Sequence, residues 1–312
     1  MPTDADRRRF MLAASAAAAA LAPRAADAQA TPVVRVGSKI DTEGSLLGQL
    51  IIQTLQAGGV NTINRLQLGT TPIVRKALLA GEIDIYPEYT GNGAFFFADA
   101  ANPVWKDARA GFERVRALDL EKNKLVWLPA APANNTWSIA IRQDLATREK
   151  LSTLADLARW VNAGGRLKLA ASAEFAERPD ALPAFQAAYG FKLRADQLLL
   201  LAGGDTALTI KAAAEQTSGV NAAMAYGTDG PVAALGLVIL GDPKSVQPVY
   251  APAPVLRAEA LARQPAIAGL LAPLFKTLDT PTLQALNAQI ALEGQDAAKV
   301  AAAHLKARGL IR

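Results

Sequence analysis

The chain has 312 residues, a net charge of +5, no cysteine and a single histidine. Its length suffices for two domains with buried cores, and its basic residues are scattered without interleaved aromatic side chains, which argues against nucleic acid as a partner. The lack of cysteine excludes disulfides, cysteine nucleophiles and thiolate metal sites, and one histidine disfavours a transition-metal site, so we expect neither a metal nor a cofactor.

The first 30 residues predict an export signal. Three arginines, Arg7 to Arg9, precede an alanine-rich apolar run at 10–22, and Ala28-Gln29-Ala30 has the pattern of a signal-peptide cleavage site. The segment Arg8-Arg9-Phe10-Met11 approximates a twin-arginine signal, but a general secretory signal has the same shape, so the export route stays open. The apolar run is too short to span a bilayer. We expect a soluble periplasmic monomer that begins near Thr31; an uncleaved anchor is the alternative.

The next segment alternates strands and helices. Strands are predicted at 33–37, 64–68 and 82–86, and helices at 46–57 and 71–80. This β-α-β-α-β order predicts a parallel sheet with helices on its faces.

A second set of α/β elements follows a long segment, 98–131, which has helical periodicity after Lys106. The predicted strands are at 136–142, 167–171, 221–225 and 237–240, and the helices at 154–161, 181–189 and 207–215. Residues 250–254 predict an extended crossing, and 257–310 are mostly helical. We therefore expect a signal peptide at 1–30, a first lobe formed by 31–136 and 250–312, a second lobe at 137–249, and a ligand cleft between the lobes.

The most informative segment runs from Gly81 to Gly93. Its predicted strand leads into a Pro-Glu-Tyr-Thr-Gly turn that presents Tyr89, Thr90 and Asn92 on a loop. The alternative is a proline-stiffened turn with a partly buried tyrosine. Because no nucleophile is paired with a base here, the loop is typical of a site that holds a molecule without transforming it.

Two other segments place cations near predicted strand ends. Lys39 precedes a helix and is suited to an anionic group; alternatively, Asp41 or Thr42 caps that helix and Lys39 is solvated. Arg178 offers a planar fork for a carboxylate, or else forms a surface ion pair with Glu174 or Asp180.

Aromatic and amide groups complete the candidate set. Asn135 and Trp137 lie at the first crossing, where a core tryptophan is the alternative, and Phe175 precedes Arg178. A further turn after a predicted strand carries Tyr226, Thr228 and Asp229. Aromatic faces attract a quaternary ammonium through cation–π interactions, and cationic or amide donors suit a carboxylate. The combination indicates a small zwitterionic ligand.

Seven runs of sequence resemble the substrate-binding proteins of glycine betaine/choline/carnitine ABC importers. The runs are Gly37 to Gly44, Gln67 to Pro72, Asp84 to Gly93, Ala131 to Trp137, Ala170 to Phe175, Ala202 to Thr206 and Tyr226 to Gly230.

The resemblance implies a two-lobed periplasmic-binding fold of type II, with parallel or mixed sheets flanked by helices. It also implies that Tyr89, Trp137 and Tyr226 wall an aromatic cage and that Asn135 lies beside the ammonium methyl groups. Lys39, Asn92 and Arg178 are then implied to contact the carboxylate. The partner is a membrane-embedded permease with a cytoplasmic ATPase.

The chain departs from the common family pattern at four places. It has Asn92 where many relatives have threonine, Trp137 where many have tyrosine, and Gly44 where many have glutamine. It also has Thr209 or Ile210 where many have a further cage tyrosine. A depleted cage predicts weaker betaine binding or a different compatible solute.

The sequence therefore predicts a non-enzymatic receptor that binds a quaternary-ammonium osmoprotectant for an ABC importer. Another small zwitterion or an amino-acid-like solute is the alternative ligand. A sensory domain and an exported hydrolase using Asp84, Glu88 or Asp229 are alternative classes. The only histidine, His304, has no Gly-x-Ser-x-Gly partner and is expected on the surface of an alanine-rich helix.

Overall fold

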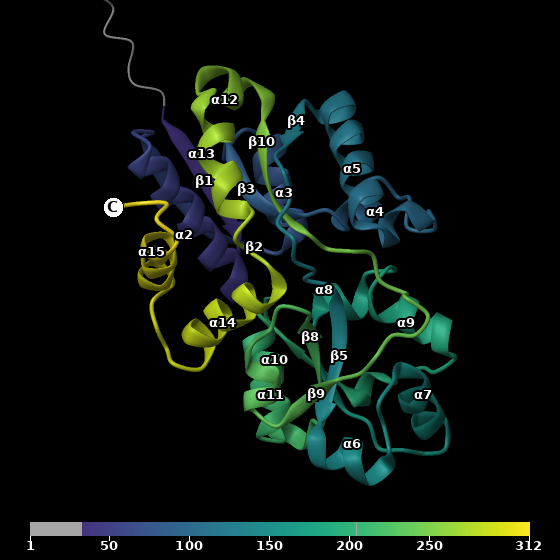
Figure 1. The fold of residues 1–312 in the computed structure, drawn as a ribbon. Coiled ribbons are helices and arrows are strands. Elements are labelled where there is room, and N and C mark those ends of the chain that lie inside the picture. Colours follow the sequence, from purple (N-terminus) through teal and green to yellow (C-terminus); the bar gives the residue numbers. More distant parts are fainter. Residues whose placement is uncertain (1–32, 204) are drawn as a thin grey trace, which may run out of the picture. The chain divides into compact units, whose positions relative to one another are not determined.

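The computed structural model describes residues 33–203 and 205–312, so the predicted export signal lies outside the described residues. Within these ranges, none of the helices has the length and apolar character needed to cross a membrane. The described chain forms two five-stranded sheets with helices around them (Figure 1).

The first sheet has the strand order β2-β1-β3-β10-β4. β1 is parallel to β2 and β3, whereas β10 is antiparallel to β3 and β4. The strands are β1 (Val34–Lys39), β2 (Thr62–Gly69), β3 (Ile85–Tyr89), β4 (Leu125–Trp127) and β10 (Pro252–Arg257). Four of them come from the first part of the chain and one returns from the C-terminal part.

The second sheet repeats this arrangement, with the order β7-β6-β8-β5-β9. β6 is parallel to β7 and β8, and β5 is antiparallel to β8 and β9. The strands are β5 (Trp137–Arg142), β6 (Leu169–Ser172), β7 (Leu198–Leu201), β8 (Ala222–Tyr226) and β9 (Leu237–Ile239). The chain passes between the sheets at 128–136 and again at 240–251.

Helices cover both sheets. Asp41 caps α2 by accepting a hydrogen bond from the Gly44 amide at 2.6 Å, and the C-terminal helices α13, α14 and α15 pack on α2. The helices around the first sheet are α2 (Thr42–Ala57), α3 (Thr71–Leu79), α4 (Asn92–Phe96), α5 (Ala108–Asn123), α12 (Ala258–Arg263), α13 (Ala266–Phe275), α14 (Thr280–Ala291) and α15 (Ala297–Ala307). Those that follow β5 to β8 are α6 (Gln143–Glu149), α7 (Leu154–Asn162), α8 (Ala173–Glu177), α9 (Leu182–Tyr189), α10 (Thr206–Ala214) and α11 (Pro231–Ala234).

The predicted parallel order of the first three strands is confirmed, but several boundaries were wrong. The third strand does not end at Tyr86; it continues through Pro87 to Tyr89, so the predicted turn is partly strand. Pro87 lies opposite Pro254 of β10, and therefore neither strand presents a backbone amide at this pair. Helix α2 begins at Thr42, four residues earlier than predicted.

Several short elements were missed, among them the helices α4, α8 and α11. β4 lies in the segment that was predicted as helical, because its three residues are too short to show a strand period. β7 has the sequence Leu-Leu-Leu-Leu, which lacks alternation, and α6 directly follows β5.

One apolar cluster extends from the first sheet into the second. It includes Leu46 and Leu50 of α2, Ile139 of β5 and Phe185 of α9. The prediction of a surface position for His304 was wrong: it is in α15 as expected, but only 7% exposed, with Nε2 3.1 Å from the hydroxyl of Thr277. Burial lowers the pKa of this histidine below its ordinary value.

Candidate functional site

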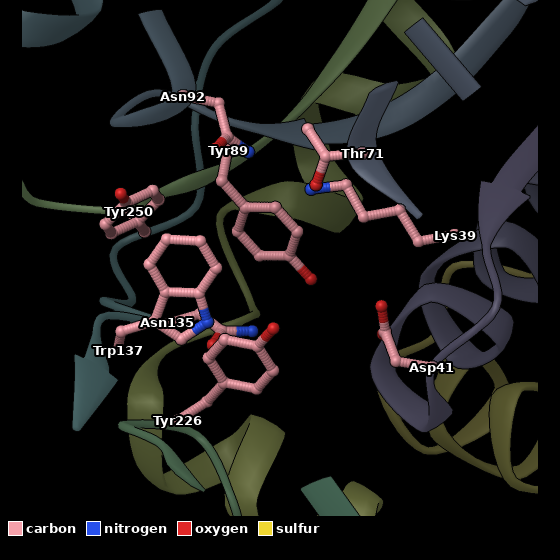
Figure 2. A pocket seen from close by; sticks show the side chains of 9 residues that line it. All are labelled: Lys39, Asp41, Thr71, Tyr89, Asn92, Asn135, Trp137, Tyr226 and Tyr250. Carbon is pink, nitrogen blue, oxygen red and sulfur yellow. The ribbon is translucent and has the colours of Figure 1, made fainter. Parts of the chain in front are cut away.

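A small cavity, whose volume open to water is about 30 Å³, lies where the two crossing segments meet the sheets. Ligand pockets usually measure ~300–1,000 Å³, so the walls must separate to admit a solute. Its lining residues are Lys39, Asp41, Thr71, Tyr89, Asn92, Asn135, Trp137, Tyr226 and Tyr250 (Figure 2).

Four aromatic side chains form the apolar part of the cavity. Tyr89 is the last residue of β3, whereas Trp137 begins β5 opposite Tyr226 in the antiparallel pair of β5 and β8. The rings of Trp137 and Tyr226 are stacked, with centroids 6.3 Å apart and planes at 19°. The ring of Tyr250, from the second crossing, is 5.7 Å from that of Trp137. The walls thus come from both sheets and a crossing.

Lys39 belongs to a buried polar cluster beside Tyr89. Its Nζ is 2.8 Å from Oε1 of Glu88 and 4.6 Å from the centre of the Tyr89 ring. Asn92 donates to the same Glu88 oxygen at 2.7 Å. The alternative of a solvated Lys39 was wrong, because this residue is only 7% exposed. One ammonium hydrogen is used by Glu88, and a lysine has three.

Glu43, in the first turn of α2, was missed by the sequence analysis. Its Oε1 accepts hydrogen bonds from the Tyr89 hydroxyl at 2.8 Å and from Nδ2 of Asn135 at 2.6 Å. Its Oε2 accepts from Nδ2 of Asn287 in α14 at 2.7 Å. A buried acidic residue at the start of a helix resembles an ordinary dipole or capping residue in sequence, so only the fold reveals this role.

Arg178 does not line the cavity. Its guanidinium is bound bidentately by Asp180, at 2.6 and 2.9 Å, and also contacts Glu174. The ion-pair alternative is therefore the observed arrangement, although it is buried and not on the surface. The guanidinium lies 4.1 Å from the ring centre of Phe95 and 4.7 Å from that of Trp137, so it supports the tryptophan wall from behind.

Four other predicted site residues lie behind the walls. The hydroxyl of Thr90 donates to the Val249 carbonyl and accepts from the Ala251 amide, which holds the second crossing. Phe175 packs edge-on against Trp137. Asp229 accepts hydrogen bonds from the Tyr226 amide and the Thr206 hydroxyl, which fixes the turn after β8. The carbonyl of Thr228 accepts from Asn287.

Sequence reasoning also missed three lining residues. Tyr250 was noticed as part of the second crossing, and its position mirrors that of Trp137 at the first. Asp41 and Thr71 lie at helix starts, where capping is their commoner role. The residues considered for a missing cage wall do not line the cavity: Thr209 donates to the Met224 carbonyl and Ile210 is in the core.

Burial controls the ionisation of the groups around the cavity. It raises the pKa of Asp41 to about 6, although the nearby Lys39 lowers it. It raises the pKa of Asp229 to about 7, although the hydrogen bonds from Tyr226 and Thr206 lower it. Burial also raises the pKa values of Tyr89, Tyr226 and Tyr250 well above that of a free tyrosine. The three hydroxyls are therefore protonated donors at neutral pH.

The carboxylates considered for hydrolysis are held in structural contacts. Asp84 is paired with Arg35 and Arg263, and Glu88 accepts from Lys39, Asn92 and the Tyr86 hydroxyl. Asp229 fixes a turn. No cluster of three or more potential metal ligands is found in residues 33–203 and 205–312.

Comparisons with known proteins show which family the chain belongs to. The model of the family described as the substrate binding domain of ABC-type glycine betaine transport systems matches residues 32–307. The glycine betaine-binding protein YehZ of Escherichia coli is 66% identical over 281 residues, covering 90% of this chain and 92% of that protein. A glycine-betaine-binding protein of Pseudomonas aeruginosa is 32% identical, covering 89% and 88%.

Solved structures confirm the two-lobed fold of type II. Apo YehZ, 66% identical, superposes with a TM-score of 0.65 and covers 89% of this chain and 99% of that chain. A glycine betaine/carnitine/choline ABC transporter structure, 21% identical, superposes with a TM-score of 0.69, covering 90% and 99%. The chain therefore belongs to the family of substrate-binding domains of ABC-type glycine betaine transport systems, whose members are binding proteins of transporters.

Proposed function

We propose that this protein binds glycine betaine or a similar quaternary-ammonium solute in the aromatic cavity and delivers it to an ABC permease. The observation that carries the proposal is the convergence of Tyr89, Trp137, Tyr226 and Tyr250 on one small cavity. A quaternary ammonium has no N–H to donate, so aromatic faces are its natural partners, at about 0.5–2 kcal/mol each.

The polar lining suits the other end of such a ligand. Lys39 retains donors beyond the one given to Glu88, and Asn92 lies beside it on the cavity wall. We assign the ligand carboxylate to this side and the methyl groups to the aromatic side, next to Asn135. Arg178, Phe175, Thr90, Thr228 and Asp229 support the walls in this proposal without direct ligand contact.

The proposal has a wider setting. The lobes are formed by 31–136 with 250–312 and by 137–249, and they close on the ligand by a hinge at the two crossings. The chain is exported to the periplasm by its N-terminal signal, cleaved near Ala30, and acts as a monomer. Its partner is a membrane-embedded permease with a cytoplasmic ATPase. Family membership and the cavity support this setting.

Calorimetric titration of mature protein, unfolded and refolded to remove carried ligand, tests the assignment. We expect saturable binding of glycine betaine, choline, carnitine or proline betaine. Tyr226→Ala removes one cage wall and should weaken binding at least tenfold, which corresponds to about 1.4 kcal/mol.

Tyr189→Ala is the matched control, because Tyr189 bonds to Asp242 and does not line the cavity. It should change the dissociation constant less than about twofold. If none of the four solutes produces heat with the refolded wild-type protein, the quaternary-ammonium assignment is rejected.

A further inference from the structure

Glu43 is a buried carboxylate whose hydrogen bonds all come from neutral groups. It is 5% exposed, and its three donors are one hydroxyl and two side-chain amides. Among the ion pairs of residues 33–203 and 205–312, none includes Glu43, whereas the neighbouring Glu88 is paired with Lys39. A buried charge without an opposite charge is costly, which favours the arrival of a cation nearby.

Glu43 reaches the cavity through two lining residues. A carboxylate accepts hydrogen bonds and does not donate them, so Asn135 must turn its NH₂ group toward Glu43. The carbonyl oxygen of Asn135, Oδ1, then has no partner among the described residues, although the side chain is buried in the cavity wall. The negative end of this amide dipole is left for a ligand.

The charge of Glu43 also affects the cavity through Tyr89. Its hydroxyl donates to Glu43, and a hydrogen bond to a carboxylate shifts electron density toward the phenol ring. The ring faces of a more electron-rich phenol attract cations more strongly. Tyr89 and Asn135 lie together on the cavity wall in Figure 2.

We propose that Glu43 is the positioning residue that makes the cavity select a positively charged head group over a neutral one of the same shape. It acts by fixing the amide orientation of Asn135 and by polarising Tyr89. This inference rests on the proposed function, because it concerns the ligand of the same cavity.

The test compares two ligands that differ only in the positive charge: glycine betaine and tert-butylacetate, in which a tert-butyl group replaces trimethylammonium. Charge selection is measured by the dissociation constant of tert-butylacetate divided by that of glycine betaine. Both constants come from direct calorimetry and from competition against glycine betaine. Glu43→Gln is nearly isosteric but uncharged, and it allows the Asn135 amide to reverse. We expect the ratio to fall at least tenfold in this variant, or about 1.4 kcal/mol.

Two further variants separate charge selection from a structural role. Asn287→Ala removes one donor to Glu43 but keeps the carboxylate and both cavity contacts, so the ratio should stay within about twofold of wild type. Tyr89→Phe keeps the ring but breaks its bond to Glu43, so the ratio should fall even if Glu43→Gln does not fold.

The outcomes distinguish this inference from the proposed function. A wild-type protein that binds no quaternary ammonium rejects both. A wild type that binds glycine betaine, with a ratio unchanged in Glu43→Gln, rejects the role of Glu43 alone, and a ratio unchanged in Tyr89→Phe rejects the polarisation of Tyr89. If Glu43→Gln weakens the binding of both ligands by the same factor, Glu43 has a purely structural role.

Discussion

Acidic side chains around the cavity have different partners and therefore different roles. Glu88 is neutralised by Lys39, Asp41 caps α2, and Glu43 collects neutral donors. Asp229 lies further back, where it accepts two hydrogen bonds at the turn that follows β8. Since its two bonds come from a backbone amide and a threonine hydroxyl, an asparagine can replace it in nearly the same geometry.

Asp229 should make stability depend on pH. Burial raises its pKa to about 7, and Glu43 and Asp205 add to this effect. Between about pH 4 and pH 7 the unfolded chain releases the proton while the folded protein keeps it, so the free energy of unfolding falls as pH rises. Asp229→Asn removes this dependence. Urea unfolding measures the free energy of unfolding of both proteins. The value for wild type minus that for the variant should fall by as much as about 4 kcal/mol between about pH 4 and pH 7.

A difference that stays constant with pH would show that Asp229 is ionised throughout in the folded protein. Thr206→Val serves as the control, because it removes one hydrogen bond to Asp229 and leaves the carboxyl group in place.

At the residue scale, the sequence predicted the cavity lining where an unusual side chain stood at a strand end. Tyr89, Trp137 and Tyr226 all fit that description, and all three line the cavity. Glu43 and Tyr250 escaped prediction because their roles depend on partners far away in sequence, such as Asn287. Local sequence does not contain that pairing.

At the element scale, helix α14 links the second sheet to the first part of the chain. It packs on α2, yet Gln284 donates to the Gly227 carbonyl at 2.9 Å and Asn287 donates to the Thr228 carbonyl at 3.1 Å. The turn at 227–230 directly follows Tyr226, a cavity wall. The position of α14 is therefore coupled to that of the wall.

Gly230→Ala should disturb this link without touching the cavity. A Cβ at this position would lie 2.2 Å from the Gln284 carbonyl oxygen and 2.7 Å from the Ala288 Cβ, so α14 must move. We expect a loss of about 1–3 kcal/mol in the free energy of unfolding, as for overpacked cores, and weaker glycine betaine binding. Denaturant unfolding and calorimetry measure the two effects.

Gly241→Ala is the matched control, because its nearest neighbours would be at an ordinary 3.6 Å. It should change stability by less than about 0.5 kcal/mol. Full binding by Gly230→Ala would mean that Tyr226 is placed independently of α14.

The elements themselves were predictable where their periodicity ran over many residues. α2 and the strands β1, β5 and β8 follow from apolar patterns, whereas the three-residue β4 does not. Pro87 misled the prediction of β3, since a proline usually ends a strand. Its compatibility with the sheet depends on Pro254, which is 167 positions later in the chain.

At the scale of the whole described chain, the two sheets share one apolar cluster that passes through Tyr89, Trp137 and Tyr250. Two other clusters belong to one sheet each, around Tyr86 in the first and around Ile210 in the second. The two halves therefore share one continuous apolar cluster, and each has a further cluster of its own. The order of predicted elements allowed this division to be expected, but not the continuity of the core across it.

A ligand in the cavity should consequently stabilise both halves together. At about 100 times its dissociation constant, glycine betaine should add about 2.7 kcal/mol to the free energy of unfolding. Hydrogen exchange should slow at the end of β3, which carries Tyr89, and at the end of β8, which carries Tyr226. β2, whose residues do not line the cavity, is the internal reference. A solute held by walls from both sheets must be released before either strand opens, so exchange should slow in both. Slower exchange in only one of β3 and β8 would place the ligand against one sheet.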